Sequence, residues 1–287
     1  MDYISKNYEK RTLYSGLHGY HAHHGCEFNK PKGYSVRKYR IGVELETEFH
    51  NPTAARRFKE SSSNWFYLER DGSIGGIGTE GIEIITIPLR PQDARDLNFW
   101  SDNLTHHICE DASSWDTDGR CGLHVHIGNE RLGGCPQAIE ETQAKLIYFH
   151  EHFLKDHPVT KRVYGRSRSY HEMDGRTDHG AEMSRCREVL MKDRKKQEEL
   201  KDAMRNARNT GFRYHAINVT NQRTTEFRLG KGSLNAARIA AVVEWCDLQC
   251  GYARRINWGQ MSVEDFFDYL KYNASDNLRH YIGEWLD

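Results

Sequence analysis

The sequence lacks any long apolar stretch. None of its apolar runs approaches the ~20 residues that a membrane-spanning helix needs. The opening residues, MDYISKNYEKR, lack the apolar segment of a secretory signal. We therefore expect a cytoplasmic protein with no membrane span. Its 287 residues suffice for one large domain or two small ones.

The chain also lacks a C-x-x-C pair and a net charge. Its cysteine count is odd, at 7, which together with the missing signal predicts reduced thiols. We prefer buried free thiols, and a zinc site shared by Cys109, Cys121 and Cys135 is the alternative. The 41 Lys and Arg residues equal the 41 Asp and Glu residues. This balance argues against a general nucleic-acid-binding protein, because such proteins usually carry a basic excess.

Two parts of the chain differ in composition and in hydrophobic periodicity. Residues 1–36 are rich in Gly, His, Tyr and Lys and have no sustained period, which indicates an N-terminal arm. Metal binding by its histidines is the alternative. Residues 37–287 show no repeat and no linker, so we expect one catalytic domain of the α+β class that ends in helices. We expect strands over 38–49, 65–73, 81–89, 122–128, 214–220 and 224–230, and helices over 91–108, 136–156, 182–208, 233–256, 262–272 and 275–286.

Three of these strands share a pattern in which one apolar residue stands between two charged or ligating residues. They are Glu44-Leu45-Glu46, His124-Val125-His126 and Glu226-Phe227-Arg228. Residues i and i+2 of a strand point to the same face, about 6.6 Å apart. A solvated face also alternates, but like charges at this spacing repel one another unless a cation lies between them. In a fourth strand, Glu83 lies within an Ile-rich run, where a lone buried carboxylate is costly.

A single polar sheet face that binds metal explains all four strands. Glutamate oxygens suit Mg²⁺ or Mn²⁺. Arg228 would neutralise charge on a phosphoryl group in transfer. The G-x-x-x-x-G-K-[ST] motif is absent, so this is not a P-loop protein. Two alternatives stay open: a metal-dependent hydrolase or nuclease that uses the same face, and a non-catalytic ligand-binding protein.

The order of these motifs resembles the amidoligase type 2 family, over roughly residues 38–250. This family belongs to the carboxylate–amine ligase superfamily, with glutamine synthetase and glutamate–cysteine ligase. The resemblance implies a curved antiparallel sheet, a glutamine-synthetase-like half-barrel, backed by helices. It also implies an ATP-dependent ligase that joins small-molecule or peptide carboxylates to amines through an acyl phosphate, with Mg²⁺ or Mn²⁺. The matching motifs are G-V-E-L-E (42–46), D-G-S (71–73), G-I-E-I-I (81–85), G-L-H-V-H-I-G (122–128), Asn218 and T-E-F-R (225–228).

The resemblance also implies roles for particular residues. The metal ligands would be Glu44, Glu46, Glu83, His124 and Glu226. The nucleotide would be bound by His124, His126, Asn218, Arg166, Arg168 and Arg228. Arg166 and Arg168, with Tyr170 nearby, lie in an irregular basic stretch, and an exposed basic loop is the alternative interpretation.

Three residues are the catalytic candidates: Arg228, Glu80 and Asp71. Arg228 would contact the terminal phosphate, and either carboxylate could take the proton of the amine. Glu80 lies three residues before Glu83, so a regular strand would place it on the opposite face unless a bulge at Gly81 brings it round. Asp71 and Ser73 could instead simply form a turn.

Overall fold

The computed structural model describes residues 39–61, 65–72, 74, 79–108, 112–113, 121–165, 187–188, 197–209 and 215–286. The arm predicted over 1–36 lies outside these residues, as do Ser73, Cys109, Arg166, Arg168 and Tyr170. In the described ranges, no helix combines the length and the apolar character that crossing a membrane requires.

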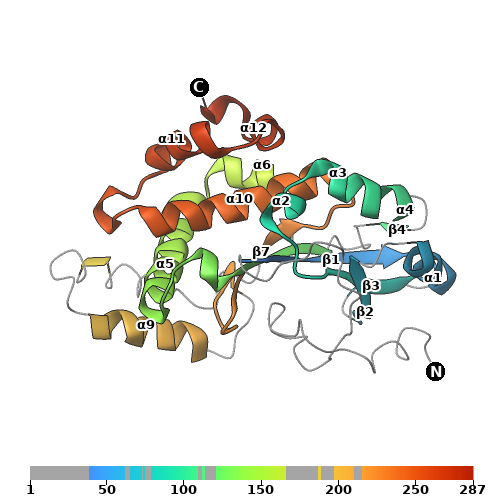
Figure 1. Cartoon of the computed structure of the whole chain (residues 1–287), viewed down its shortest axis with the longest axis horizontal. Helices are drawn as coiled ribbons and strands as arrows, with labels where there is room; N and C mark the ends of the chain where they lie inside the picture. The colour runs from blue at the N-terminus through green and yellow to red at the C-terminus, as the bar shows by residue number, and fades with distance from the viewer. Residues whose placement is uncertain are drawn as a thin grey trace.

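The centre of the molecule is an open sheet in which every strand pairing is antiparallel (Figure 1). The strand order is β2-β3-β1-β5-β7-β6, and β4 pairs with β1 beside this path. Helices back the sheet, which confirms the predicted α+β class with an antiparallel sheet backed by helices. The strands are β1 (Ile41–Phe49), β2 (Phe66–Arg70), β3 (Glu80–Thr86), β4 (Ala112–Ser113), β5 (Gly122–Gly128), β6 (Ile217–Asn218) and β7 (Thr224–Lys231).

Helices begin where side chains or prolines satisfy the first backbone N–H groups. Pro136 stands at the start of α5, as predicted. The cap of α10 is Asn235, whose side chain accepts from the N–H of Arg238, and not the predicted Ser233. The helices are α1 (Pro52–Ser61), α2 (Pro91–Ala94), α3 (Leu97–Trp100), α4 (His106–Ile108), α5 (Pro136–Phe149), α6 (Pro158–Tyr164), α9 (Gln197–Asn209), α10 (Ala236–Arg255), α11 (Val263–Asn273) and α12 (Asp276–Ile282), with π-helical turns η3 (Ser101–Thr105) and η5 (His150–Leu154).

Two segments of the chain differ from the prediction. The segment 91–108 is divided, because the side chain of Asp96 accepts a hydrogen bond from the N–H of Asn98 and starts a new helix there. The stretch after Pro158 was predicted to be irregular but begins with α6, where Pro158 occupies the first turn.

The core lies between the sheet and α10. Val43, Leu45, Val125 and Phe227 are all at most 1% exposed and belong to one apolar cluster. Helix α10 is buried around most of its circumference, because the sheet lies on one side and α11 and α12 lie on the other (Figure 1). Its Cys246 and Cys250 are buried free thiols, so core packing accounts for both.

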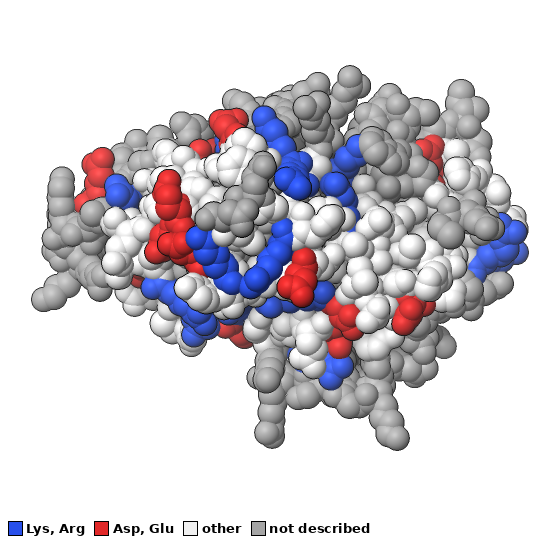
Figure 2. Space-filling view, turned by 90° about the horizontal axis from the view of Figure 1, so that it is seen from above, with Lys and Arg blue, Asp and Glu red and all other residues white. Residues whose placement is uncertain are grey.

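Charges of both signs mix on the surface seen from the side of α11 and α12 (Figure 2). On this face, described Lys and Arg side chains lie beside described Asp and Glu side chains. On α11, Nζ of Lys271 lies 3.2 Å from Oδ1 of Asp268.

Candidate active site

Strand register assembles the polar residues on one face of the sheet. Glu44 on β1 lies opposite His124 on β5, and His126 lies opposite Glu226 on β7. On the other side of β1, Glu46 lies opposite Glu83 on β3. Directly paired residues share a face. The structure thus brings together six residues from four strands.

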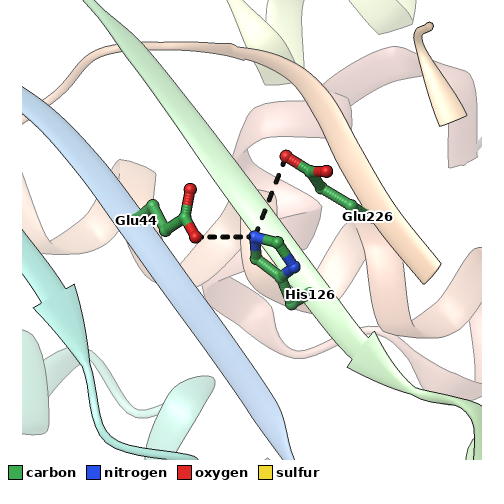
Figure 3. Close-up of side chains that lie close together, drawn as sticks. All are labelled: Glu44, His126 and Glu226. Carbon is green, nitrogen blue, oxygen red and sulfur yellow. Dashed lines mark ion pairs between the residues drawn. The ribbon is translucent and has the colours of Figure 1, made fainter. Parts of the chain in front are cut away.

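Glu44, His126 and Glu226 form the first group, which we call the histidine cluster (Figure 3). Nε2 of His126 lies 3.1 Å from Oε1 of Glu44 and 3.8 Å from Oε1 of Glu226. Each of these three residues is at most 5% exposed. Their ligand atoms lie within 4.8 Å of one another, close enough for all three to coordinate one cation.

Opposite charges balance the histidine cluster from within the protein. Glu226 accepts a hydrogen bond of 2.7 Å from Nδ2 of Asn218 and another from Arg228, two residues along β7. Burial alone would raise the pKa of Glu226, but Arg228 and His126 lower that pKa below its ordinary value. Burial opposes the charged form of His126, yet Glu44 and Glu226 raise its pKa.

Glu46, Asp71 and Glu83 form the second group, the carboxylate cluster, whose ligand atoms also lie within 4.8 Å of one another. The backbone N–H of Gly122 donates to Oε2 of Glu46 at 2.5 Å. Burial raises the pKa of Glu46. The pKa of Glu83 lies well above its ordinary value, first because of burial and then because Glu44, Glu46 and Asp71 repel its charge.

His124 lies between the two clusters. Its Nδ1 is 3.4 Å from Oε2 of Glu44 in the histidine cluster. Its Nε2 is 3.8 Å from Oε1 of Glu46 in the carboxylate cluster. His126 makes up the three-residue set with Glu44 and Glu226, and His124 lies near carboxylates of both sets. That His124 is itself a metal ligand stays a prediction.

Two further carboxylates on this face were missed by the sequence reading. Glu69 on β2 lies opposite Glu83 and is 6% exposed. Glu48 on β1 is 7% exposed and accepts a hydrogen bond from Oγ1 of Thr79 at 2.5 Å. Both follow the i, i+2 rule, since Glu48 extends the Glu44 and Glu46 series and Glu69 precedes Asp71 by two residues. Applied to every strand, the rule would have found them.

Glu80 does not join either cluster. The ladder between β1 and β3 is regular from Glu44 to Phe49, so the bulge that could have turned Glu80 is absent there. Glu80 pairs with Phe49 on the apolar face, where its Oε1 lies 3.6 Å from Nε of Arg70. An irregularity occurs instead between β5 and β7, where Arg228 and Leu229 lie between Phe227 and Gly230, opposite the single residue His124.

The donor atoms decide which cofactor fits. The carboxylate cluster offers only oxygen and suits Mg²⁺ or Mn²⁺. The histidine cluster offers two carboxylates and one imidazole, a set that suits Mn²⁺ and also Zn²⁺. The described residues therefore fit two divalent cations on one sheet face.

Comparison with protein-family models identifies a family that this chain matches. A family model described as "Putative amidoligase enzyme" matches residues 39–248, which include both clusters and Arg228. No curated protein matches the sequence.

Proposed function

The chain belongs to the amidoligase family, and from that premise we propose that it is an ATP-dependent ligase that joins a carboxylate to an amine. One observation carries the proposal. Glu44 and Glu46, two residues apart on β1, belong to different clusters. One strand therefore supplies a ligand to each of two cation sites, which is the arrangement needed to hold a polyphosphate from two sides.

In the proposed reaction, an oxygen of the substrate carboxylate attacks the γ-phosphorus of ATP, and ADP leaves. The product of this step is an acyl phosphate. The amine nitrogen then attacks the acyl carbon, and phosphate departs with the electrons of the broken C–O bond. The amine loses one proton as the amide forms.

The clusters would hold Mg²⁺ or Mn²⁺, which when bound would neutralise charge on the phosphate oxygens. Arg228 would contact the transferring phosphoryl group, because its guanidinium already lies at the histidine cluster beside Glu226. Asn218 would fix the orientation of the Glu226 carboxylate through its hydrogen bond. His126 would complete the ligand set of the histidine cluster, and His124 would connect the two clusters.

Glu80 and Asp71, the two candidates for the base that takes the proton of the amine, lie in different surroundings. Glu80 points to the apolar face and is paired with Arg70, so we assign it no part in the reaction. Asp71 shares the carboxylate cluster with Glu46 and Glu83, so we propose it as a metal ligand. A base that takes the proton of the amine is left unassigned among the described residues.

The histidine cluster also supports a second candidate, a metal-dependent hydrolase. One imidazole and two carboxylates are ligand types found in hydrolytic zinc sites. Such an enzyme would transfer the substrate to water rather than to an amine.

The test is purified protein incubated with ATP, Mg²⁺ and a panel of carboxylates and amines. We expect ADP, phosphate and an amide detected by mass spectrometry, with all three lost in Glu46→Gln and retained in Glu264→Gln, a change at an exposed residue on α11. Release of AMP and pyrophosphate would contradict the acyl phosphate. Cleavage of substrates without ATP or amine would favour the hydrolase.

A further inference from the structure

Gly81 lies beneath the turn that carries Asp71. A Cβ atom built at Gly81 would lie 2.4 Å from the carbonyl oxygen of Asp71 and 2.3 Å from that of Ile74. The N–H of Asp71 donates to the carbonyl oxygen of Gly81 at 3.0 Å. The backbone carbonyls of Asp71 and Ile74 therefore lie directly against the α-carbon of Gly81.

The position of Gly81 on the sheet matters for the carboxylate cluster. Gly81 precedes Glu83 by two residues on β3 and lies opposite Glu48 on β1, so it belongs to the polar face. A side chain at this position would occupy the space that the backbone of the turn now fills. The missing side chain is what allows the turn to cross this face.

We propose that Gly81 is a positioning residue that holds Asp71 against Glu46 and Glu83. The inference rests on the proposed function, because it assumes that the carboxylate cluster binds a cation. Carbon–oxygen contacts lie at about 3.3–3.6 Å even when they are attractive, so any side chain would displace the turn by roughly 1 Å. A functional site tolerates about 0.5 Å.

The constraint is steric rather than conformational. Among the described glycines, only Gly165 and Gly283 have positive φ angles, so Gly81 has a backbone that other residues can adopt. Two of the three nearest atoms are backbone carbonyl oxygens, of Asp71 and Ile74, which cannot rotate aside as the third, Cγ1 of the Ile74 side chain, could. Gly72, in the same turn, has nothing within 4 Å of its own Cβ position and is the matched control.

The test counts Mn²⁺ bound per folded chain, by electron paramagnetic resonance, with folded fractions from circular dichroism. We expect two Mn²⁺ sites in the unchanged protein, one for each cluster. Gly81→Ala should weaken one of them by about 10–100-fold, the usual effect of disturbing the support of a metal ligand. Asp71→Asn should lose the same site, and Gly72→Ala should keep both.

Two further variants separate positioning from general damage. The double variant Gly81→Ala, Asp71→Asn should bind no more weakly than Asp71→Asn alone, since both changes act on one interaction. Asp71→Glu alone should weaken Mn²⁺ binding. Combined with Gly81→Ala, it should partly restore binding, because the longer side chain of glutamate can reach the cluster from the displaced backbone. A loss of stability alone would not produce this rescue.

The outcomes distinguish the two levels of the proposal. Normal Mn²⁺ binding in Gly81→Ala, with binding lost in Asp71→Asn, would overturn the role of Gly81 and leave the proposed function intact. Normal binding in Asp71→Asn would remove the carboxylate cluster as a metal site, and the two-cation proposal with it. Failure of Gly81→Ala to fold in the cold, when Gly72→Ala folds, would make Gly81 a folding residue and overturn the inference.

Discussion

The histidine cluster and the carboxylate cluster share a sheet face but differ in their source of positive charge. Arg228 and His126 lower the pKa of Glu226, whereas burial and neighbouring carboxylates raise the pKa of Glu83. The protein therefore balances the first cluster itself and leaves the second with excess negative charge. The comparison teaches that two groups of similar composition on one face can depend on added cations to different degrees.

The largest expected effect concerns Arg228, the internal cation of the histidine cluster. Arg228→Lys should lower kcat by about 10²–10³-fold, because lysine lacks the planar fork that can clamp a phosphoryl group through two hydrogen bonds. ATP affinity should fall much less. Steady-state kinetics check this, provided that the variant melts within a few degrees of the unchanged protein. Near-normal turnover in a well-folded variant would reduce Arg228 to a structural partner of Glu226.

The next effect is the response of the carboxylate cluster to added cations. Mg²⁺ at about 100 times its dissociation constant stabilises the folded state by about 2.7 kcal/mol. We expect Mg²⁺ to raise the melting temperature, and more so with ATP, and Glu46→Gln to remove most of the rise. Differential scanning fluorimetry measures it, with the exposed Glu264→Gln as control. An undiminished rise in Glu46→Gln would show that this cluster is not the cation site.

In the presence of a chelator, neutralising one carboxylate in each cluster should change the melting temperature in opposite directions, by smaller amounts. Glu83→Gln should raise the melting temperature at about pH 8 by a few degrees, because it removes a repelled charge. Glu226→Gln should lower it, since Arg228 loses a charged partner. If both variants shifted in the same direction, the two clusters would not differ as we describe.

The same pair predicts the dependence on pH. The folded-state pKa of Glu83 is raised, so the metal-free protein gains stability as pH falls through it. The folded-state pKa of Glu226 is lowered, so its contribution is lost only as pH falls from the unfolded-state pKa through the folded-state value. As pH is lowered from about 8 to about 5 in the presence of a chelator, the melting temperature should rise less in Glu83→Gln than in the unchanged protein.

The smallest effect concerns Gly122, the backbone donor to Glu46. A Cβ there would lie 3.0 Å from both Oε2 of Glu46 and Nε2 of His124, which are side-chain atoms that can move. Gly122→Ala should therefore weaken Mn²⁺ binding at the carboxylate cluster less than the ~10-fold expected when the support of a ligand is lost. Parallel Mn²⁺ titrations of Gly122→Ala and Gly81→Ala compare how much each change weakens binding. A larger loss of affinity in Gly122→Ala would contradict the expected order.

The sequence alone predicted which face each polar residue occupies but not how the residues group. Alternation with a period of two fixes the face of Glu44, Glu46, His124 and Glu226. Grouping depends on register, which is set by pairing between strands far apart in the chain. For that reason the sequence predicted one polar face that holds cations without dividing its residues, and the structure separates them into two clusters with His124 between them.

Asp71 and Glu80 show the limits of the local pattern in opposite ways. A D-G-S segment predicts a turn, but only the close packing on Gly81 reveals that the turn brings Asp71 to Glu83. Spacing along β3 correctly predicted that Glu80 and Glu83 point to opposite faces of the sheet, because the ladder between β1 and β3 is regular. Local spacing therefore decided the face of Glu80, whereas the grouping of Asp71 with Glu46 and Glu83 depends on contacts between strands.

The strand order also implies a sequence of assembly. All three residues of the carboxylate cluster lie between positions 46 and 83, on β1, β3 and the turn after β2. The histidine cluster joins Glu44 to Glu226, so it needs β7, which is made only after most of the chain. During synthesis, contacts that are close in sequence form before distant ones. A chain emerging from the ribosome can therefore bring the residues of its carboxylate cluster together before Arg228 and Glu226 complete the histidine cluster.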